Sequence, residues 1–265
     1  MSAARRFGIG LAALVVLFAI AGPFVAQNAI DALGDPLAAP SSRHWLGTDP
    51  FGRDVFARLA VGARLSLLVA LLATALAGTI GVCLGVLAGA RDGWLSRVLS
   101  PAIDLALALP RVVVLLVLVT VTGTLGPVML GVLLGATGWP AIARLARGEA
   151  LRLAHAPHVT AAVALGATPL RLLRREILPG ALPPALVALT LGVADVLLLE
   201  AGLSFLGIGI RPPTPTWGGM ILDAQAYMSD APWLLLAPSA ALVAATVAAT
   251  LLGDALRSHL QPHER

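Results

Sequence analysis

The sequence contains no lysine, and all 18 of its basic residues are arginines. A P-loop nucleotide site needs a lysine to reach the terminal phosphates, so this chain does not hydrolyse ATP through such a site. The one cysteine, Cys83, lies in a hydrophobic run and excludes a disulfide within the chain. Charged residues make up 12% of the 265 residues, about half of the ~25% typical of a soluble domain. These shortages exclude a P-loop ATPase and an ordinary soluble protein.

Apolar residues dominate instead, at 58% of the chain, and the mean hydropathy is +0.90. Several runs approach the ~20 apolar residues that cross a bilayer as a helix. We therefore predict an all-α, polytopic membrane protein with six transmembrane helices, at about 7–27, 64–90, 98–122, 127–146, 185–203 and 233–253. The first span could instead be a signal peptide, because Arg5 and Arg6 precede a short apolar run.

The arginines favour one orientation in the membrane. If the N-terminus is inside, twelve of the 18 lie on the cytoplasmic side, five lie outside, and Arg111 falls in the third span. Cytoplasmic loops carry such an excess of basic residues, so we expect both termini in the cytoplasm of a multi-pass plasma or inner membrane protein. The same arginine excess explains the sequence pI near 10.8, so the high pI does not indicate nucleic-acid binding.

Two segments outside the predicted spans are longer than turns. In the first, Asp49 before Pro50 is a favourable helix start, and it predicts a short interfacial helix whose apolar face is formed by Val55, Phe56 and Leu59. The second joins the fifth and sixth spans, and its prolines and glycines exclude long regular elements. Its Trp217, with Trp233 beyond it, suits the level of the lipid headgroups.

The stretch "TAAVALGATPLRLLRREILPGALPP", residues 160–184, combines small residues, arginines and prolines within an otherwise apolar sequence. Gly166 interrupts one helical pattern, and Thr168-Pro169 can start a second helix. Three prolines should stop that helix before the fifth span: Pro179, Pro183 and Pro184. The result is two short cytoplasmic helices around a glycine elbow. It is either an amphipathic connector on anionic lipid or a knob that docks a partner.

This stretch resembles the cytoplasmic loop of the permease subunits of binding-protein-dependent ABC importers. The family pattern is Glu-Ala-Ala, three residues, Gly, nine residues, then Ile-x-Leu-Pro. Thr160 stands in place of the usual glutamate, and Glu176 in place of the isoleucine. The resemblance implies a coupling helix that inserts into a groove of an ATPase. The residues that we assign to ATPase coupling are Thr160, Ala161, Ala162, Gly166, Arg171, Arg174, Arg175, Leu178 and Pro179.

Three further stretches are similar to the dipeptide, oligopeptide and nickel permease subfamily, in its second subunit: "LGTDPFGRDVFARLAVGARLSL", "LSFLGIGIRPPTPTWGGM" and "APWLLLAP…LLGDALRSHLQP". The likeness implies the type I ABC importer permease fold, with an N-terminal helix and periplasmic segment (1–61), a transmembrane domain (62–254) and a cytoplasmic tail (255–265). It implies as partners a second homologous permease, two ABC ATPases, an extracytoplasmic solute-binding protein and membrane lipid, but no nucleic acid. ATP would be used by the partner ATPases, and this chain would bind no cofactor. Peptides are the expected substrate, with nickel and other small solutes left open.

Ionisable residues inside the spans are costly, at about 2.5–3.5 kcal/mol each at the bilayer centre. Asp104 and Arg111 are seven residues apart and ~10 Å apart along a helix, so each should meet a partner on another helix. Asp195 lies near the middle of the fifth span and either lines the pathway or makes an interhelical hydrogen bond. Four residues are assigned to the substrate pathway or its gate: Asp195, Glu200, Arg211 and Trp217. For Glu200 the favoured alternative is a structural role.

Two other classes of protein fit the sequence less well. An intramembrane enzyme is disfavoured, because all five histidines are expected in loops or the tail and neither HExxH nor GxSxG occurs. No catalytic residue and no metal site are therefore predicted. A secondary transporter or channel that works without an ATPase would favour inverted repeats and paired interrupted helices, which the sequence does not show.

Overall fold

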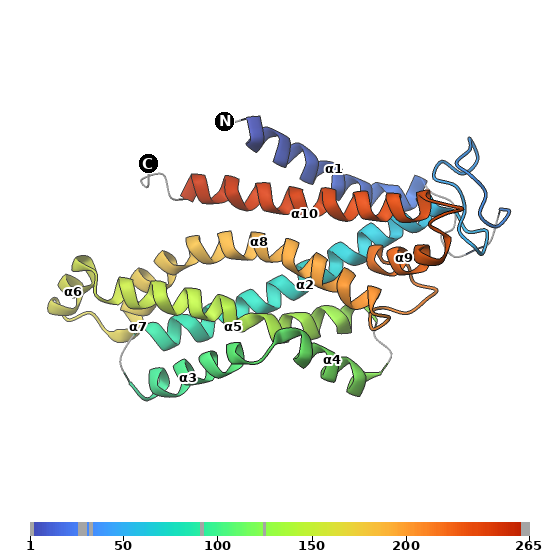
Figure 1. Ribbon diagram of the computed structural model, residues 1–265. Helices are drawn as coiled ribbons and strands as arrows, with labels where there is room; N and C mark the ends of the chain where they lie inside the picture. The colour runs from blue at the N-terminus through green and yellow to red at the C-terminus, as the bar shows by residue number, and fades with distance from the viewer. Residues whose placement is uncertain (1–2, 26–30, 32–33, 91–92, 124–125, 261–265) are drawn as a thin grey trace. The chain divides into compact units, whose positions relative to one another are not determined.

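The computed structural model describes residues 3–25, 31, 34–90, 93–123 and 126–260. Among these residues every regular element is a helix (Figure 1). The one β-type pairing among them is an isolated bridge between Thr48 and Asp54. The long helices are α1 (Ala3–Val25), α2 (Val55–Gly89), α5 (Pro127–Ala154), α8 (Leu178–Phe205) and α10 (Trp233–Leu260). The shorter ones are α3 (Trp94–Ala108), α4 (Arg111–Thr122), α6 (Pro157–Ala164), α7 (Pro169–Leu172) and α9 (Trp217–Ala224).

Among the described residues, five segments are long and apolar enough to cross a membrane, and the bent pair of α3 and α4 makes six if it is counted as one span. The all-α, polytopic fold predicted from the sequence is therefore confirmed. Contacts divide the chain into two compact units. Unit 1 comprises Met1–Leu72, Val119–Gly131 and Val193–Leu252, and unit 2 comprises Ala73–Leu118, Val132–Gly192 and Gly253–Arg265.

In unit 1, α1 runs beside α10 (Figure 1), and the two helices touch where Gly8 faces Leu251: a Cβ on Gly8 would lie 2.5 Å from the Cβ of Leu251. Aromatic contacts join α1, the loop before α2, and α2 itself. The Phe56 ring lies 5.6 Å from the ring of Phe18 and 5.0 Å from that of Trp45, both in edge-on geometry. Such edge-on pairs are a favourable arrangement of aromatic rings, so they fix the loop against the two helices.

In unit 2, α2 packs closely on α5 through three glycines spaced four residues apart, Gly81, Gly85 and Gly89. A Cβ on Gly85 would lie 2.3 Å from the carbonyl oxygen of Ala143, so only glycine allows this approach. Small residues at i and i+4 are the usual means of close helix packing in membranes. Next to this stripe, buried side chains of α2, α5 and α8 form a common core: Val82, Val86, Ala146, Ala150, Leu153, Ala181 and Ala185.

The start of α2 differs from the sequence prediction. The Asp49-Pro50 pair does not begin a separate interfacial helix, because the Asp49 carboxylate instead accepts the backbone N–H groups of Phe51 and Arg53 in a turn. The helix begins at Val55, where Asp54 Oδ1 accepts the N–H of Ala57 at 2.8 Å. The residues assigned to the interfacial helix are thus the first turns of α2, which continues to Gly89.

The third predicted span is not one straight helix. It is broken between α3 and α4, whose axes differ by 84°. The break lies at Leu109, which has an extended backbone (φ −82°, ψ 128°) and precedes Pro110. A residue before proline is disfavoured in the helical conformation, because the proline ring clashes with it.

The fifth predicted span also differs, because its prolines do not stop the preceding helix. The chain is helical from Pro169 to Phe205, with a π-helical turn at Leu173–Ile177 and with Pro183 and Pro184 inside α8. In that turn the N–H of Leu178 bonds the carbonyl of Leu173, five residues back. Such a wide turn shifts the hydrogen-bond ladder just before the prolines, which lack a donor.

Candidate functional site

The segment from Pro157 to Leu172, here called the elbow, consists of α6 and α7 joined at Gly166. Gly166 has φ +82°, a conformation that costs other residues about 1–2 kcal/mol. Thr168 precedes α7 as its N-cap, and its hydroxyl accepts the N–H of Arg171 at 3.4 Å. The glycine elbow and the Thr168 cap predicted from the sequence are therefore confirmed. The second helix is longer than predicted, since α7 continues into α8.

The elbow presents apolar side chains on its surface. Leu165, next to Gly166, is 89% exposed, and Val163 and Leu170 are 54% and 55% exposed. Val159 is buried at the base of the elbow, and Ile177, just beyond it, belongs to the core of unit 2. An exposed apolar cluster on a segment anchored in this way is typical of a surface that docks another protein.

The other residues assigned to coupling lie around this cluster. Thr160 is exposed, and its hydroxyl donates a hydrogen bond to the backbone carbonyl of Ala156, four residues earlier, at 3.2 Å. Ala161 is exposed and Ala162 half-buried, and Leu178 and Pro179 open α8 in half-buried and exposed positions. The three arginines are all exposed: Arg171, Arg174 and Arg175. The structure thus brings the whole assigned set together at one end of unit 2.

Behind the elbow lies a groove of about 800 Å³. The end of α2 and the start of α3 contribute Leu87 and Trp94, and the elbow contributes Val159 and Leu170. All of its lining residues are apolar, so the elbow is flanked by apolar surface on its inner side as well as at its tip.

Residues 81–265 match the family described as the binding-protein-dependent transport system inner membrane component. The chain belongs to this family. It is therefore a permease subunit of an ABC importer, which works with ATPase subunits, and a multi-pass inner membrane protein. The family resemblance proposed from the residue 160–184 stretch is confirmed, and a transporter that works without an ATPase is not favoured.

Relatives of this permease cover most of its length. It is 40% identical over 227 residues to a putative peptide permease protein of Brucella suis, a match that spans 85% of this chain and 75% of the relative. It is 34% identical to the dipeptide transport system permease protein DppC of Alkalihalophilus pseudofirmus, over 93% of this chain and 82% of the relative. It is 37% identical to the glutathione transport system permease protein GsiD of Shigella flexneri, over 98% of this chain and 85% of the relative.

The fold of the permease is also similar to a solved structure. A chain of the MetNI methionine ABC transporter in an inward-facing conformation superposes with a TM-score of 0.64 at 22% sequence identity. The match covers 77% of the permease and 96% of the MetNI chain. At this identity the likeness concerns the fold alone, and it supports the predicted type I importer architecture.

The charges of the third predicted span find partners on α5, as the sequence analysis expects. Asp104 of α3 pairs with Arg144 of α5 at 2.8 Å, and both side chains are more than half exposed. Arg111, the first residue of α4, donates to the carbonyl of Leu134 at 2.8 Å and to the hydroxyl of Thr137 at 3.5 Å. Arg144, near the end of the fourth predicted span (127–146), was counted with the cytoplasmic arginines, and α5 continues past it to Ala154.

The four residues assigned to the pathway or gate have different surroundings. Asp195 is exposed in the middle of α8, and Arg211 is exposed in the loop that follows α8. Glu200 and Trp217, in contrast, are 0% and 1% exposed. These two side chains do not line an open surface of the chain, because hydrogen bonds within unit 1 hold them inside. For Glu200 this geometry agrees with the structural alternative.

Sequence reasoning missed a buried ionic cluster at the start of α2. Arg58 is 3% exposed, and its Nε lies 3.4 Å from the Asp49 carboxylate, which also binds the Nε of Arg53 at 2.6 Å. Arg58 Nη2 lies 3.7 Å from Asp223 of α9. Partial burial raises the pKa of the Asp223 carboxyl, and the charges of Arg58 and Arg53 oppose that rise. The four-residue spacing of Asp49 and Arg53 is the signal that could have indicated the cluster.

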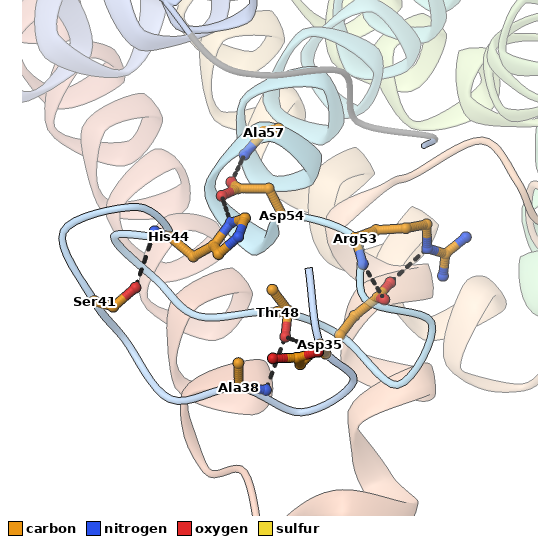
Figure 2. Close-up of polar contacts among 9 residues, drawn as sticks. Asp35, Ala38, Ser41, His44, Thr48, Arg53, Asp54 and Ala57 are labelled. Carbon is orange, nitrogen blue, oxygen red and sulfur yellow. Dashed lines mark hydrogen bonds and ion pairs between the residues drawn. The ribbon is translucent and has the colours of Figure 1, made fainter. Parts of the chain in front are cut away.

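The loop before α2 folds on its own polar contacts, several of which Figure 2 shows. Thr48 accepts the N–H of Ala38 at 2.8 Å and donates its hydroxyl to the carbonyl of Asp35. His44 Nδ1 lies 2.8 Å from Asp54 Oδ2, while the other oxygen of Asp54 caps α2. The loop, its histidine and the helix start are therefore one connected structure. Of the other histidines, His158 lies in α6 and His259 in the last turn of α10, and not in a loop or a tail as predicted.

Proposed function

We propose that this permease subunit forms half of the translocation pathway of an ATP-driven importer of peptides, and that its elbow is the coupling helix that an ATPase grips. It pairs with a second, similar permease, and an extracytoplasmic binding protein delivers the substrate. The names of the relatives support a peptide or related substrate, since they include peptide, dipeptide and glutathione permeases.

The observation that carries the coupling role is the exposed tip of the elbow. Leu165 is 89% exposed beside Gly166, which has φ +82° and no neighbouring heavy atom within 4 Å of where its Cβ would be. The apolar side chain provides contact area for a partner's groove. The open backbone turn beside it lets the partner approach closely. The exposed arginines on the following turns supply the charges that orient the partner.

In this proposal the elbow lies in the cytoplasm with both termini, and the chain itself carries out no chemistry. ATP binding closes the two ATPases, which move the elbows of the two permeases, and the pathway switches the side on which it opens. The free energy for this switch comes from the different affinities of ATP and substrate for the two states. ATP is held by the partners, and this chain binds no cofactor.

Asp195 is the pathway residue that we propose from this chain. Its side chain is exposed at mid-length of α8, where contact with lipid would be unfavourable by about 2.5–3.5 kcal/mol at the bilayer centre. An aqueous pathway between two permeases removes that penalty. A carboxylate there can bind the ammonium group of a peptide.

The test is reconstitution of the complete importer, with both permeases, both ATPases and the binding protein, in proteoliposomes. We expect uptake of a radiolabelled dipeptide that requires ATP on the ATPase side and stops when the ATPases are left out. Uptake by the permeases alone, driven by a proton or sodium gradient, would contradict the proposal.

A further inference from the structure

Glu200 of α8 lies inside unit 1 as a fully buried carboxylate, with hydroxyl donors on two helices. The hydroxyl of Ser204, one turn further along α8, donates to its Oε1 at 3.0 Å. The hydroxyl of Ser66 on α2 donates to its Oε2 at 3.3 Å. Buried acids are stable when such donors replace water, so the carboxylate and the two serines form one hydrogen-bonded group.

The same group holds the first turn of α9. Ser66 Oγ accepts the backbone N–H of Trp217 at 3.3 Å, and Thr216 makes a side-chain hydrogen bond with Glu200. Thr216 is also the N-cap of α9, because its Oγ1 accepts the N–H of Gly219 at 3.1 Å. N–H groups at a helix start need partners from outside the helix. Here those partners are hydroxyls that in turn donate to a single carboxylate.

Packing fixes the same turn from the sides. The Trp217 indole is 1% exposed and donates its Nε1–H to the carbonyl of Leu59 on α2 at 3.2 Å. A Cβ on Gly62 of α2 would lie 3.3 Å from the Trp217 ring, and one on Gly218 would lie 2.6 Å from Cα of Ala201 on α8. Two glycines thus let α9 approach α2 and α8 closely, and Glu200 lies at the junction of the three helices.

We infer that Glu200 is a positioning residue that fixes the start of α9 to α2 and α8, so that α9 moves with these helices when the importer changes state and not as a separate flap. The inference rests on the proposed transport function. A carboxylate suits this task because it only accepts hydrogen bonds, and its two oxygens have capacity for all three hydroxyls. Within the loop from Arg211 to Gly219, the inference places Thr216–Gly219 in the fixed part.

The test compares two substitutions that separate hydrogen bonding from charge. Glu200→Gln keeps the shape and an acceptor oxygen but removes the charge, whereas Glu200→Leu removes every acceptor. A spin label at Gln225→Cys, exposed just after α9, reports the mobility of the helix in a Cys83→Ser background. The protein is the complete importer in proteoliposomes, and dipeptide uptake is measured on the same samples.

We expect the label to be restricted with Glu200 and with Glu200→Gln, and mobile with Glu200→Leu. Uptake should fall at most about threefold in Glu200→Gln and at least tenfold in Glu200→Leu. If both variants lose uptake equally while the label stays restricted, Glu200 acts through its charge and the inference is wrong. A restricted label in Glu200→Leu also overturns it.

Two controls complete the design. Asp195→Leu removes an acid from the same helix without touching α9 and must leave the Gln225 label restricted. Ser66→Ala breaks the link between Trp217 and Glu200 without removing an acid, and it should loosen the label even if Glu200→Leu does not assemble. If the unsubstituted importer shows no ATP-driven uptake, the transport proposal fails while the mobility results still decide whether Glu200 holds α9.

Discussion

Arg58 shows how one residue can determine the structure around it. A guanidinium that is 3% exposed needs nearby acids, and this one has Asp49 from the preceding loop and Asp223 from α9. Removal of one partner from a buried ion pair usually costs about 3–5 kcal/mol, because the remaining charge stays buried. The ion pair between Arg58 and Asp49 therefore fixes the loop before α2 against that helix.

Asp49→Ala should destabilise the folded permease by about 3 kcal/mol, because it leaves Arg53 and Arg58 without their shared carboxylate. The measurement is the midpoint of thermal unfolding of the purified permease in detergent. Asp35→Ala is the matched control, since Asp35 is exposed in the same loop and binds Thr48 through its backbone carbonyl. Equal midpoints for the two variants would show that the Asp49 ion pairs contribute nothing.

Asp223 makes stability depend on pH in a direction unusual for an acid. Its pKa is raised in the folded protein, chiefly by desolvation, so the folded state holds the proton more tightly than the unfolded state. This contribution to stability is greatest below the ordinary Asp value of ~3.9 and is lost as the pH rises through the folded value. Asp223→Asn should therefore gain stability relative to the unsubstituted protein as the pH rises from ~4 to ~7. Thermal midpoints measured in pairs across that range test it, and parallel curves would contradict the assigned shift.

Among the elements, those whose structure is determined by nearby residues in the sequence were predictable. The elbow followed from Gly166 and the Thr168-Pro169 start, because left-handed turns and helix caps are local chemistry. The bend between α3 and α4 at Pro110 and the continuous helix through Pro183 and Pro184 were not predicted. A proline weakens a helix in both places, and neighbouring helices decide whether it breaks or continues.

The buried ionic cluster and the Glu200 group were missed for a related reason. Each joins residues far apart in the chain, such as Ser66 and Glu200, which are 134 positions apart. A single sequence shows that an acid lies in a span but not which helices approach it. The position of Glu200 within a span could be predicted from the sequence. Its hydrogen-bond partners could not, because they depend on the close packing of α2, α8 and α9.

The glycine stripe of α2 gives a prediction about helix packing. Gly85→Ala places a Cβ 2.3 Å from the Ala143 carbonyl, so α2 and α5 must separate, and overpacking of this kind typically costs about 1–3 kcal/mol. Gly148→Ala on α5 is the control, since no neighbouring heavy atom lies within 4 Å of its Cβ position. It should be neutral or stabilising by up to about 1 kcal/mol. Thermal midpoints decide, and equal effects would argue against close α2–α5 contact.

The coupling function of the elbow should be lost when a large side chain is introduced at its tip. Gly166→Trp places a large side chain where a partner must approach and should abolish ATP-driven uptake while membrane insertion is retained. Gly166→Asn is the control, because Asn tolerates a positive φ and adds little volume. Uptake and co-purification with the ATPases are the measurements. Full uptake in Gly166→Trp would exclude the elbow as the docking site.

At the scale of the whole molecule, the apolar surface indicates how the permease is used. Of the most apolar window of α1, 17% is buried within the chain, compared with 44% for α2. The rest of α1 meets lipid or another subunit, and its exposed side chains include Leu14, Leu17 and Ile20. A chain with this much apolar surface is completed by its membrane and its partners, as expected for a permease subunit.

The orientation of the molecule can be tested at two exposed positions, one on each side of the proposed membrane. In a Cys83→Ser background, Phe51→Cys reports the loop before α2 and Leu165→Cys reports the tip of the elbow; these side chains are 67% and 89% exposed. If the arginine excess marks the cytoplasmic side, a membrane-impermeant thiol reagent added to spheroplasts should label position 51 at once and position 165 only after permeabilisation. The reverse order would place the elbow outside the cell, where no ATPase could reach it.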